Sequence, residues 1–248
     1  MEGHIYLLSH DKKLIDMVEE SYDSEKLLQE LLADYPDLLA SDQIGESPRR
    51  WILISREIGV PDNENMPNRW SLDHLFLDQD GIPTLIEVKR SSDTRIRREV
   101  VGQMLDYAAN AVLYWKPETI RAKFETLCKD IEPAQVLAEK LNVLSAETFW
   151  QTVETNLRIG KIRLIFVADD IPNELRRIIE FLNEQMSPTE VLGIAIRQFK
   201  GQGLTTLVPT IYGQTAQTQY AKASNPNTEK WTEETFFPEL ASRTSHIE

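Results

Sequence analysis

Apolar and polar positions recur along the chain with two different periods, which separate the expected strands from the expected helices. KIRLIFVAD at 161–169 and VLGIAIRQF at 191–199 are short, continuous apolar runs bounded by turn-forming residues, as expected of buried strands. Between them, IPNELRRIIEFLNEQM has the spacing of an amphipathic helix. The three segments together predict a strand-helix-strand unit.

The N-terminal half combines helices with strands in a different order. SEKLLQELLADYPDLL at 24–39 reads as a helix that Ser24 can cap and Pro36 helps to end, with one apolar side made by Leu27, Leu28, Leu31 and Leu32. From Arg95 to about Tyr114 the apolar spacing is again helical. The remaining expected elements are strands at 4–9, 49–60 and 204–213, two strands around a turn in 71–90, a loop at 61–70, and helices at about 117–141 and 145–157.

Composition is that of an ordinary globular protein. Hydrophobic residues make up 41% and charged residues 27% of the 248 positions, and no apolar run approaches the ~18–20 residues of a membrane helix. The N-terminus lacks a basic segment followed by a long apolar one, and the single cysteine, Cys128, excludes a cysteine-based zinc site. A reducing cytoplasm and no membrane association are therefore expected.

The charge is strongly acidic. Forty acidic and 27 basic residues give a formal net charge of −13, which argues against indiscriminate adhesion to nucleic acid or to anionic membranes. A role on nucleic acid therefore requires a local basic patch. The length predicts one elaborated domain at 1–213, with a helical insertion at about 117–157, followed by a polar tail at 214–248 that is rich in Thr, Gln, Asn and Ser.

The turn of the expected hairpin decides which acidic residues meet. If residues 80–81 form a two-residue turn, His74 lies opposite Glu87 and Asp73 is on the other face. If residues 79–81 form a three-residue loop with the final glycine in the left-handed conformation, Asp73 lies opposite Glu87. Both sequences suit their turns, so the pattern leaves both registers open.

The second register would group Asp73, Glu87 and Lys89 on one strand face. Ionised groups within an apolar sheet are costly unless they are paired or bound to metal, and two opposed carboxylates repel each other. A hard divalent cation resolves both problems, because Mg²⁺ prefers one or two carboxylates together with waters and phosphate oxygens. The ammonium group of Lys89 could then hold and polarise an attacking water, which is the chemistry of metal-assisted phosphodiester hydrolysis. The simpler alternative is a salt bridge of these acids with Lys89 or a nearby arginine.

Two further signals follow in the next helix. Arg95, Arg97 and Arg98 lie at its start, where the helix dipole disfavours cations, so a bound phosphate would give them a purpose. A solvated turn neutralised by neighbouring acids is the alternative. Farther on, Gln103 and Tyr107 lie four residues apart and share one side of the helix, which we expect to face the edge of the sheet.

In this order and spacing, the residues resemble the PD-(D/E)xK nuclease superfamily. Asp73, thirteen further residues and then Glu87-Val88-Lys89 is similar to the family's metal-binding signature. The addition of Gln103-x-x-x-Tyr107 is similar to the RecB-type branch, which includes NucS-like nucleases. Leu72 stands where the family's name-giving proline would be. The resemblance covers roughly residues 24–112.

The resemblance implies an α/β fold with a restriction-endonuclease-like core, in which a helix, a three-stranded antiparallel meander, a second helix and a further strand follow one another. Added helices and C-terminal strands would complete it. It also implies a role for each matching residue. Metal ligands would be Asp73, Glu87, the carbonyl of Val88 and Glu25; catalytic residues would be Asp73, Glu87, Lys89, Gln103 and Tyr107; nucleic-acid contacts would be Arg90, Arg95, Arg97 and Arg98.

The implied function is a Mg²⁺- or Mn²⁺-dependent nuclease, more specifically an endonuclease acting on DNA rather than RNA. The alternative is a nuclease-like binding or assembly module, without activity of its own, in a defence, repair or mobile-element complex. The acidic charge favours a partner protein that delivers the nucleic acid, and a homodimer is also compatible with the sequence.

Overall fold

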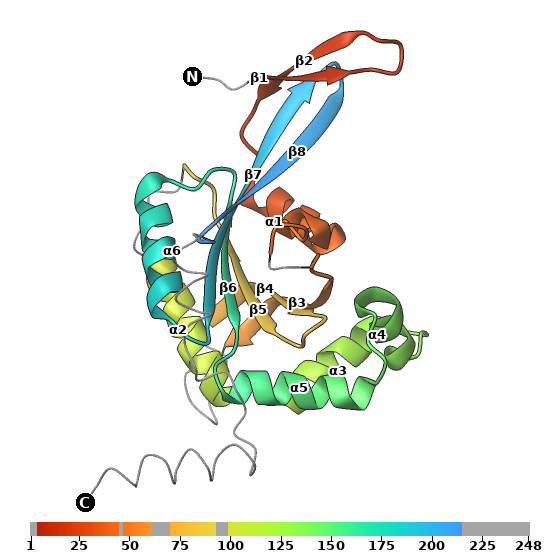
Figure 1. Ribbon diagram of the computed structural model, residues 1–248, viewed down its shortest axis with the longest axis vertical. Coiled ribbons are helices and arrows are strands. Elements are labelled where there is room, and N and C mark those ends of the chain that lie inside the picture. Colours follow the sequence, from red (N-terminus) through yellow and green to blue (C-terminus); the bar gives the residue numbers. More distant parts are fainter. Residues whose placement is uncertain (1–3, 45–46, 61–69, 93–98, 215–248) are drawn as a thin grey trace, which may run out of the picture.

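The computed structural model describes residues 4–44, 47–60, 70–92 and 99–214. This part of the chain folds around one eight-stranded mixed sheet (Figure 1). The strands are β1 (His4–Leu8), β2 (Leu14–Glu19), β3 (Trp51–Val60), β4 (Trp70–Asp78), β5 (Pro83–Val88), β6 (Arg163–Ala168), β7 (Glu190–Gly201) and β8 (Leu204–Tyr212). The helices are α1 (Glu25–Asp34), the short 3₁₀ helix η1 (Pro36–Leu39), α2 (Glu99–Tyr114), α3 (Pro117–Cys128), α4 (Pro133–Leu141), α5 (Ala146–Arg158) and α6 (Asn173–Gln185).

The middle of the sheet joins an antiparallel half to a parallel half. Strands β3, β4 and β5 form an antiparallel meander, and β6 and β7 continue from β5 in parallel. Every residue of β5 and β6 is buried, as expected of strands covered on both faces. Because β5, β6 and β7 are parallel, their carboxyl ends lie together at one edge of the sheet, the edge formed by strand ends.

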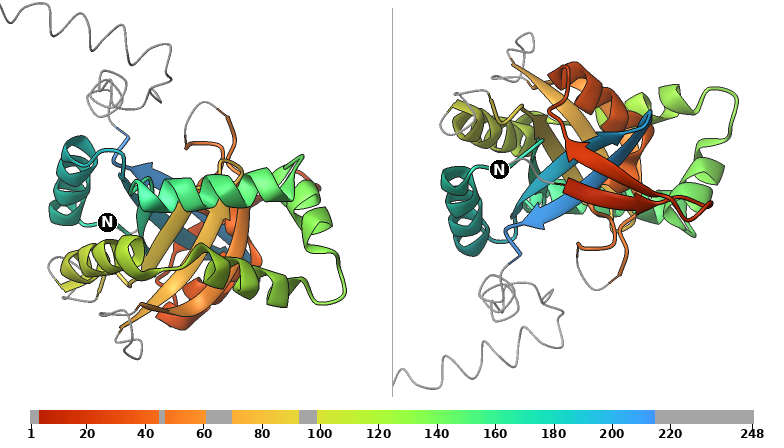
Figure 2. Two further views of the ribbon diagram at one scale, coloured as in Figure 1. Left: turned by 90° about the horizontal axis from the view of Figure 1, so that it is seen from below. Right: turned by 90° about the horizontal axis from the view of Figure 1, so that it is seen from above.

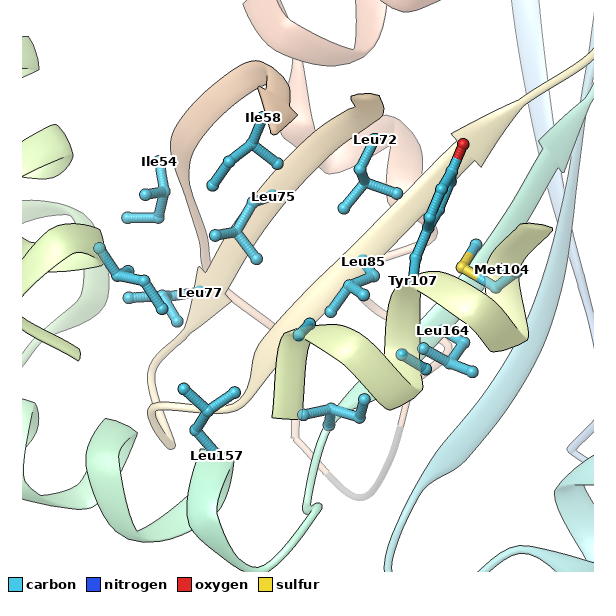
Figure 3. Close-up of a cluster of buried hydrophobic side chains, with 14 of the residues drawn as sticks. Ile54, Ile58, Leu72, Leu75, Leu77, Leu85, Met104, Tyr107, Leu157 and Leu164 are labelled. Atoms are coloured by element: carbon cyan, nitrogen blue, oxygen red, sulfur yellow. The ribbon is translucent and has the colours of Figure 1, made fainter. Parts of the chain in front are cut away.

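Two apolar cores cover the two faces of the sheet. The larger one joins the sheet to α2, α3, α5 and α6 and includes Val153 and Ile179. Leu85 and Met104, labelled in Figure 3, belong to it as well. The second joins the opposite face to α1 through Leu28, Leu32 and strand residues such as Ile86. Figures 1 and 2 show α2 and α6 on one side of the sheet and α1 on the other.

Strand β7 is long enough to pair with different strands along its length. Its first half pairs with β6, and its far end, at Phe199 and Lys200, pairs with β2. The hairpin of β1 and β2 therefore continues the sheet beyond the helices, where it projects together with the tip of β7 and β8 (Figure 1). A small third core, made of Ile15, Met17 and Phe199, holds this region together.

Most expected elements are present, with three corrections. The strand β2 was not predicted, because LIDMVE buries only its alternate residues Ile15 and Met17 and adds two acids. The expected helical range 117–141 contains two helices, separated where Lys129 adopts a positive φ and Pro133 starts a new helix. The loop expected at 61–70 contains the first residue of β4, Trp70, and its other residues lie outside the described part.

Other expectations fall partly beyond the described residues. The helix expected from Arg95 is described from Glu99 onward, and the polar tail is described only at Gln214. No helix in the described part is long and apolar enough to cross a membrane. The helices of the expected insertion do not form a separate layer, since Phe124 and Phe149 belong to the larger core.

Candidate functional site

The β4–β5 hairpin adopts the register with the three-residue loop. Its pairs run from Leu77 with Pro83 to His74 with Ile86, which leaves residues 79–81 as the loop. Gly81 has a φ of 65°, the left-handed conformation required at the end of such a loop. His74 is therefore not opposite Glu87, and the register that brings Asp73 toward Glu87 is confirmed.

The regular pairing of β4 is interrupted at Asp73. On the side of β3 the pairs pass from Arg56 with His74 directly to Ile58 with Leu72, and Glu57 between them has a φ of 49°. On the side of β5 the pairs end at His74, and the Asp73 carboxylate instead accepts the Val88 backbone N–H at 2.8 Å from Oδ2. The register of β3 with β4 is the same on both sides of this gap, and the carboxylate of Asp73 lies at the end of β5.

Lys89 connects three groups at this end of the strand. Its Nζ lies 3.1 Å from a carboxylate oxygen of Glu87 and 3.1 Å from one of Glu25 on α1. It also donates to the carbonyl of Val88 at 3.0 Å. The side chains of Glu87 and Lys89 are only 4% and 15% exposed, so their interaction is weakly screened by solvent. The fold thus gathers Asp73, Glu87 and Lys89 together with Glu25, which comes from α1 and is distant in the sequence.

The carboxylates of the site are held in an unfavourable environment. Burial, and then the charge of Asp73, raises the pKa of Glu87 to about 7. Burial also raises the pKa of Asp73, in spite of its hydrogen bond from Val88. For Lys89, burial lowers the pKa, but the acids around it, above all Glu87, raise it beyond its ordinary value. The site therefore contains two acids that resist ionisation beside an ammonium group that stays charged.

Tyr107 and Gln103 are placed differently by α2. Tyr107 is 3% exposed, and its ring rises from α2 alongside β5 (Figure 3). Burial, and then the charge of Glu87, raises the pKa of Tyr107 to about 12, so the phenol is close enough to sense the carboxylates. Gln103, one turn earlier, is exposed. The expectation that both polar groups face the edge of the sheet fits Tyr107 better than Gln103.

The arginines are only partly described. Arg90 directly follows Lys89, is half-buried, and its Nε is buried without a hydrogen-bond partner. Arg95, Arg97 and Arg98 lie outside the described residues.

Buried polar atoms without a partner are concentrated around the same edge. Among the described residues they are Glu87 Oε2, Arg90 Nε, His74 Nδ1 and the hydroxyl of Tyr22. Glu87 and Arg90 flank Lys89 in sequence, and His74 adjoins Asp73. Since nearly all buried polar groups in proteins are satisfied, such a concentration is typical of a place that binds water, an ion or a ligand.

Two neighbours of the site were missed by the sequence reasoning. The side chain of Gln29 lies close enough to Asp73 to lower the pKa of that carboxyl group, while its carbonyl oxygen lies 2.9 Å from His74 Nε2. Its position four residues after Glu25 on α1 was the available signal, because such residues share one helix side. Asp169, after β6, accepts the Ser91 N–H at 2.6 Å and so fixes the backbone beyond Lys89. Nothing in the sequence pairs Asp169 with Ser91.

The oxygen ligands at this edge suit a hard divalent cation. Asp73 and Glu87 supply carboxylates, and the unpartnered Oε2 of Glu87 has unused acceptor capacity. Glu25 adds a third carboxylate, which also contacts Lys89. In the described residues no three His, Cys, Asp or Glu side chains are grouped so that all three could hold one metal ion. A cation held by two carboxylates and a backbone carbonyl is the arrangement these residues fit.

Comparison with protein-family models, curated proteins and solved structures found no match to this chain.

Proposed function

We propose that this protein is a Mg²⁺- or Mn²⁺-dependent nuclease that hydrolyses phosphodiester bonds, most specifically as an endonuclease on DNA. The observation that carries the proposal is the convergence of Asp73, Glu87 and Lys89 at the end of β5, where two acids with raised pKa values contact a charged lysine. A salt bridge with Lys89 needs only one acid, whereas a divalent cation bound between two carboxylates would offset the repulsion of two buried acids.

The order of elements also supports the proposal. The helix α1, the meander of β3, β4 and β5, the helix α2 and the parallel strand β6 follow one another as in the restriction-endonuclease-like core of the PD-(D/E)xK superfamily. Strand β6 follows only after α3, α4 and α5, which would be additions to that core.

In this proposal, the metal is held by Asp73, Glu87 and the carbonyl of Val88, with Glu25 nearby. When bound, it would supply Lewis acidity to the phosphate and to the attacking water. Without a bound metal, the acids around Lys89 raise its pKa, so its ammonium group is charged in that state. Its role is to orient the water by hydrogen bonding and to stabilise negative charge that develops on the phosphate oxygens. Arg90 would contact a neighbouring phosphate through its unpartnered Nε.

The decisive experiment compares the protein with its Lys89→Ala variant. Supercoiled plasmid, linear duplex and single-stranded DNA, with RNA as a fourth substrate, would be incubated with Mg²⁺ or Mn²⁺. We expect metal-dependent cleavage, lost on chelation and reduced at least ~100-fold in Lys89→Ala. A matched control is Lys26→Ala on α1, which removes a lysine that is 76% exposed and paired with Glu30 on its own helix. Undiminished cleavage by a folded Lys89→Ala variant would refute the proposed role.

The second candidate is a binding or assembly module that uses this fold without its own activity. It is favoured by the ion pairs of Lys89 with Glu25 and Glu87, which partly neutralise these acids without a metal ion. The net charge of −13 also favours it. Titration calorimetry with Mn²⁺ separates the two. Binding that is lost in Glu87→Gln supports the nuclease. No binding, together with a stable complex with another protein, supports the assembly module.

A further inference from the structure

The sheet has three strands with an unpaired edge in the described part of the chain, and two of these edges are protected against further pairing. Strand β3 carries Arg56 and Glu57 together with the local irregularity at Glu57, and β8 contains Pro209. Charges, irregular backbone and proline are the usual means by which edge strands avoid pairing with other chains. Strand β1, with the sequence HIYLL, contains no Asp, Glu, Lys, Arg or Pro.

The outer face of the β1–β2 hairpin is also apolar near its turn, while farther from the turn it carries the exposed ion pair of His4 with Asp16, which lies opposite Tyr6. Its inner face is covered, because Ile15 and Met17 are buried against Phe199. On the opposite face, Leu8 and Leu14 are direct cross-strand neighbours and are 63% and 64% exposed. Tyr6, next along the same face, is 63% exposed. Large apolar side chains gathered on one exposed face mark an interaction surface more often than the same residues scattered singly.

The charge of the hairpin differs from that of the rest of the molecule. In the hairpin, residues 4–19, the three acids Asp11, Asp16 and Glu19 are opposed by Lys12 and Lys13, so its formal charge is −1, whereas the whole chain carries −13. Two copies of such an acidic chain repel each other over most of their surfaces. A hairpin that carries little net charge and projects beyond the helices is the place where two copies can approach with the least repulsion (Figure 1).

We propose that two copies of this chain associate by antiparallel pairing of β1 with β1 of a second copy, which joins their sheets into one. The register with complete overlap of His4–Leu8 places Tyr6 on the two-fold axis, opposite the partner's Tyr6. Leu8 then lies beside the partner's His4. The two tyrosines form an aromatic cross-strand pair, which is among the favourable pairs in antiparallel sheets. This inference does not depend on the proposed nuclease activity.

The first test measures the mass of the full chain in solution by sedimentation or light scattering at micromolar concentrations. We expect a dimer for the protein as it stands. Tyr6→Lys and Tyr6→Glu should each be monomeric, because each places like charges opposite one another on the axis. An equimolar mixture of the two variants should form dimers again, because the opposed charges are then complementary. Since Tyr6 is 63% exposed in the single chain, each variant should still fold and should lose only the stability that association adds.

The matched control is Leu127→Lys, which places a lysine at a leucine on α3 that is 51% exposed and far from β1 in the sequence. It should remain dimeric.

The register has its own test by oxidative cross-linking. In Tyr6→Cys the two opposed Cα atoms lie about 4.5–5.5 Å apart, within the range a disulfide spans. In Leu8→Cys the two cysteines are four strand positions apart, roughly 14 Å, and cannot be joined. The native Cys128 is buried and should not interfere. We expect a cross-linked dimer from Tyr6→Cys and none from Leu8→Cys.

The proposal is overturned if the full chain is a monomer at these concentrations, or if Tyr6→Lys leaves a dimer intact. Cross-linking of Leu8→Cys to the same extent as Tyr6→Cys would overturn the proposed register.

Discussion

Asp73 has a structural role and, in the proposed site, a chemical one. Its carboxylate accepts the N–H of Val88, which is fully buried, at a position where β4 no longer pairs with β5. The same carboxylate would bind the metal. The two roles can be separated because an amide oxygen can accept the hydrogen bond but is a much weaker metal ligand than a carboxylate.

We therefore predict different outcomes for two substitutions of Asp73. Asp73→Ala leaves the Val88 N–H unsatisfied and should lower the free energy of unfolding by about 1–3 kcal/mol. Asp73→Asn should stay within about 1 kcal/mol of the original protein, because Asn can still accept that bond. Both should lose metal binding. Urea denaturation and Mn²⁺ calorimetry measure the two effects, and tight Mn²⁺ binding by Asp73→Asn would contradict the proposed ligand role.

The raised pKa of Glu87 predicts a particular dependence of stability on pH. Its pKa rises from an ordinary value of 4.5 to about 7 in the fold, so the folded state binds an extra proton between these two values. The stability that this proton confers is complete below about pH 4.5 and is lost as the pH rises through about 7. Glu87→Gln cannot ionise, so it should become more stable relative to the original protein over this interval, by at most about 3 kcal/mol.

The measurement is metal-free denaturation of both proteins in chelator between pH 4.5 and 8. If the free energies of unfolding of the original protein and Glu87→Gln change with pH in parallel, the pKa of Glu87 in the folded state is close to its ordinary value of 4.5. Glu99→Gln serves as the control for the same change of residue type, since Glu99 is exposed at the start of α2.

At the scale of elements, the β4–β5 hairpin depends on a helix that is distant in sequence. Asn156 of α5 donates to the carbonyl oxygens of Asp80 and Gly81, at 3.0 and 2.9 Å. Val153, on the same helix, packs directly against Gly81. Helix α5 thus holds the loop whose length sets the position of Asp73, and it connects the helical segment to the site.

Gly81→Ala is expected to destabilise the protein for two separate reasons. The φ of 65° disfavours any side chain, and an added Cβ would lie 3.2 Å from both Cγ2 and the backbone N of Val153. The control is Gly160→Ala, where φ is 70° but no atom lies within 4 Å of the added Cβ. Gly160→Ala should cost about 1 kcal/mol from backbone strain alone, and Gly81→Ala about 1 kcal/mol more. If both variants lose the same free energy of unfolding in denaturant, α5 moves readily to make room for the added Cβ.

At the scale of the whole molecule, one buried arginine joins the two halves of the sheet. Arg163 at the start of β6 pairs with Asp78 at the end of β4 and with Glu190 at the start of β7, and its guanidinium lies over the ring of Trp51 on β3. Asp78 is fully buried. The network lies at the opposite end of β5 from Glu87, so it stabilises the sheet without contacting the candidate site.

Replacing Arg163 by Met should lower the free energy of unfolding by about 3–5 kcal/mol, because it removes the closest cation from a buried carboxylate. Arg176→Met is the matched control: Arg176 also lies over an aromatic ring, that of Tyr212, but its ion pair with Glu180 is exposed. That change should cost no more than about 1 kcal/mol. Denaturation of the two variants side by side checks the difference, and similar losses would show that Asp78 is adequately neutralised by Arg49 alone.

The sequence by itself determined most of the elements and the residues of the candidate site. The continuous apolar runs predicted β5, β6 and β7, because strands buried on both faces need apolar side chains at every position, and the leucines of α1 predicted its buried side. The spacing of Asp73, Glu87 and Lys89 placed them within one hairpin. The apolar pattern of the sequence did not predict β2, whose stability comes from pairing with β1 and with the far end of β7.

Only the tertiary structure decided between the two hairpin registers. Both loops suit the local sequence, and the contacts of Gly81 with Val153 and of Asn156 with the loop carbonyls come from a helix about 70 residues away. The pairing of Lys89 with Glu25 and of Asp169 with Ser91 likewise required the completed fold. Residue types and their spacing fix which groups can act, whereas long-range packing fixes which of them meet.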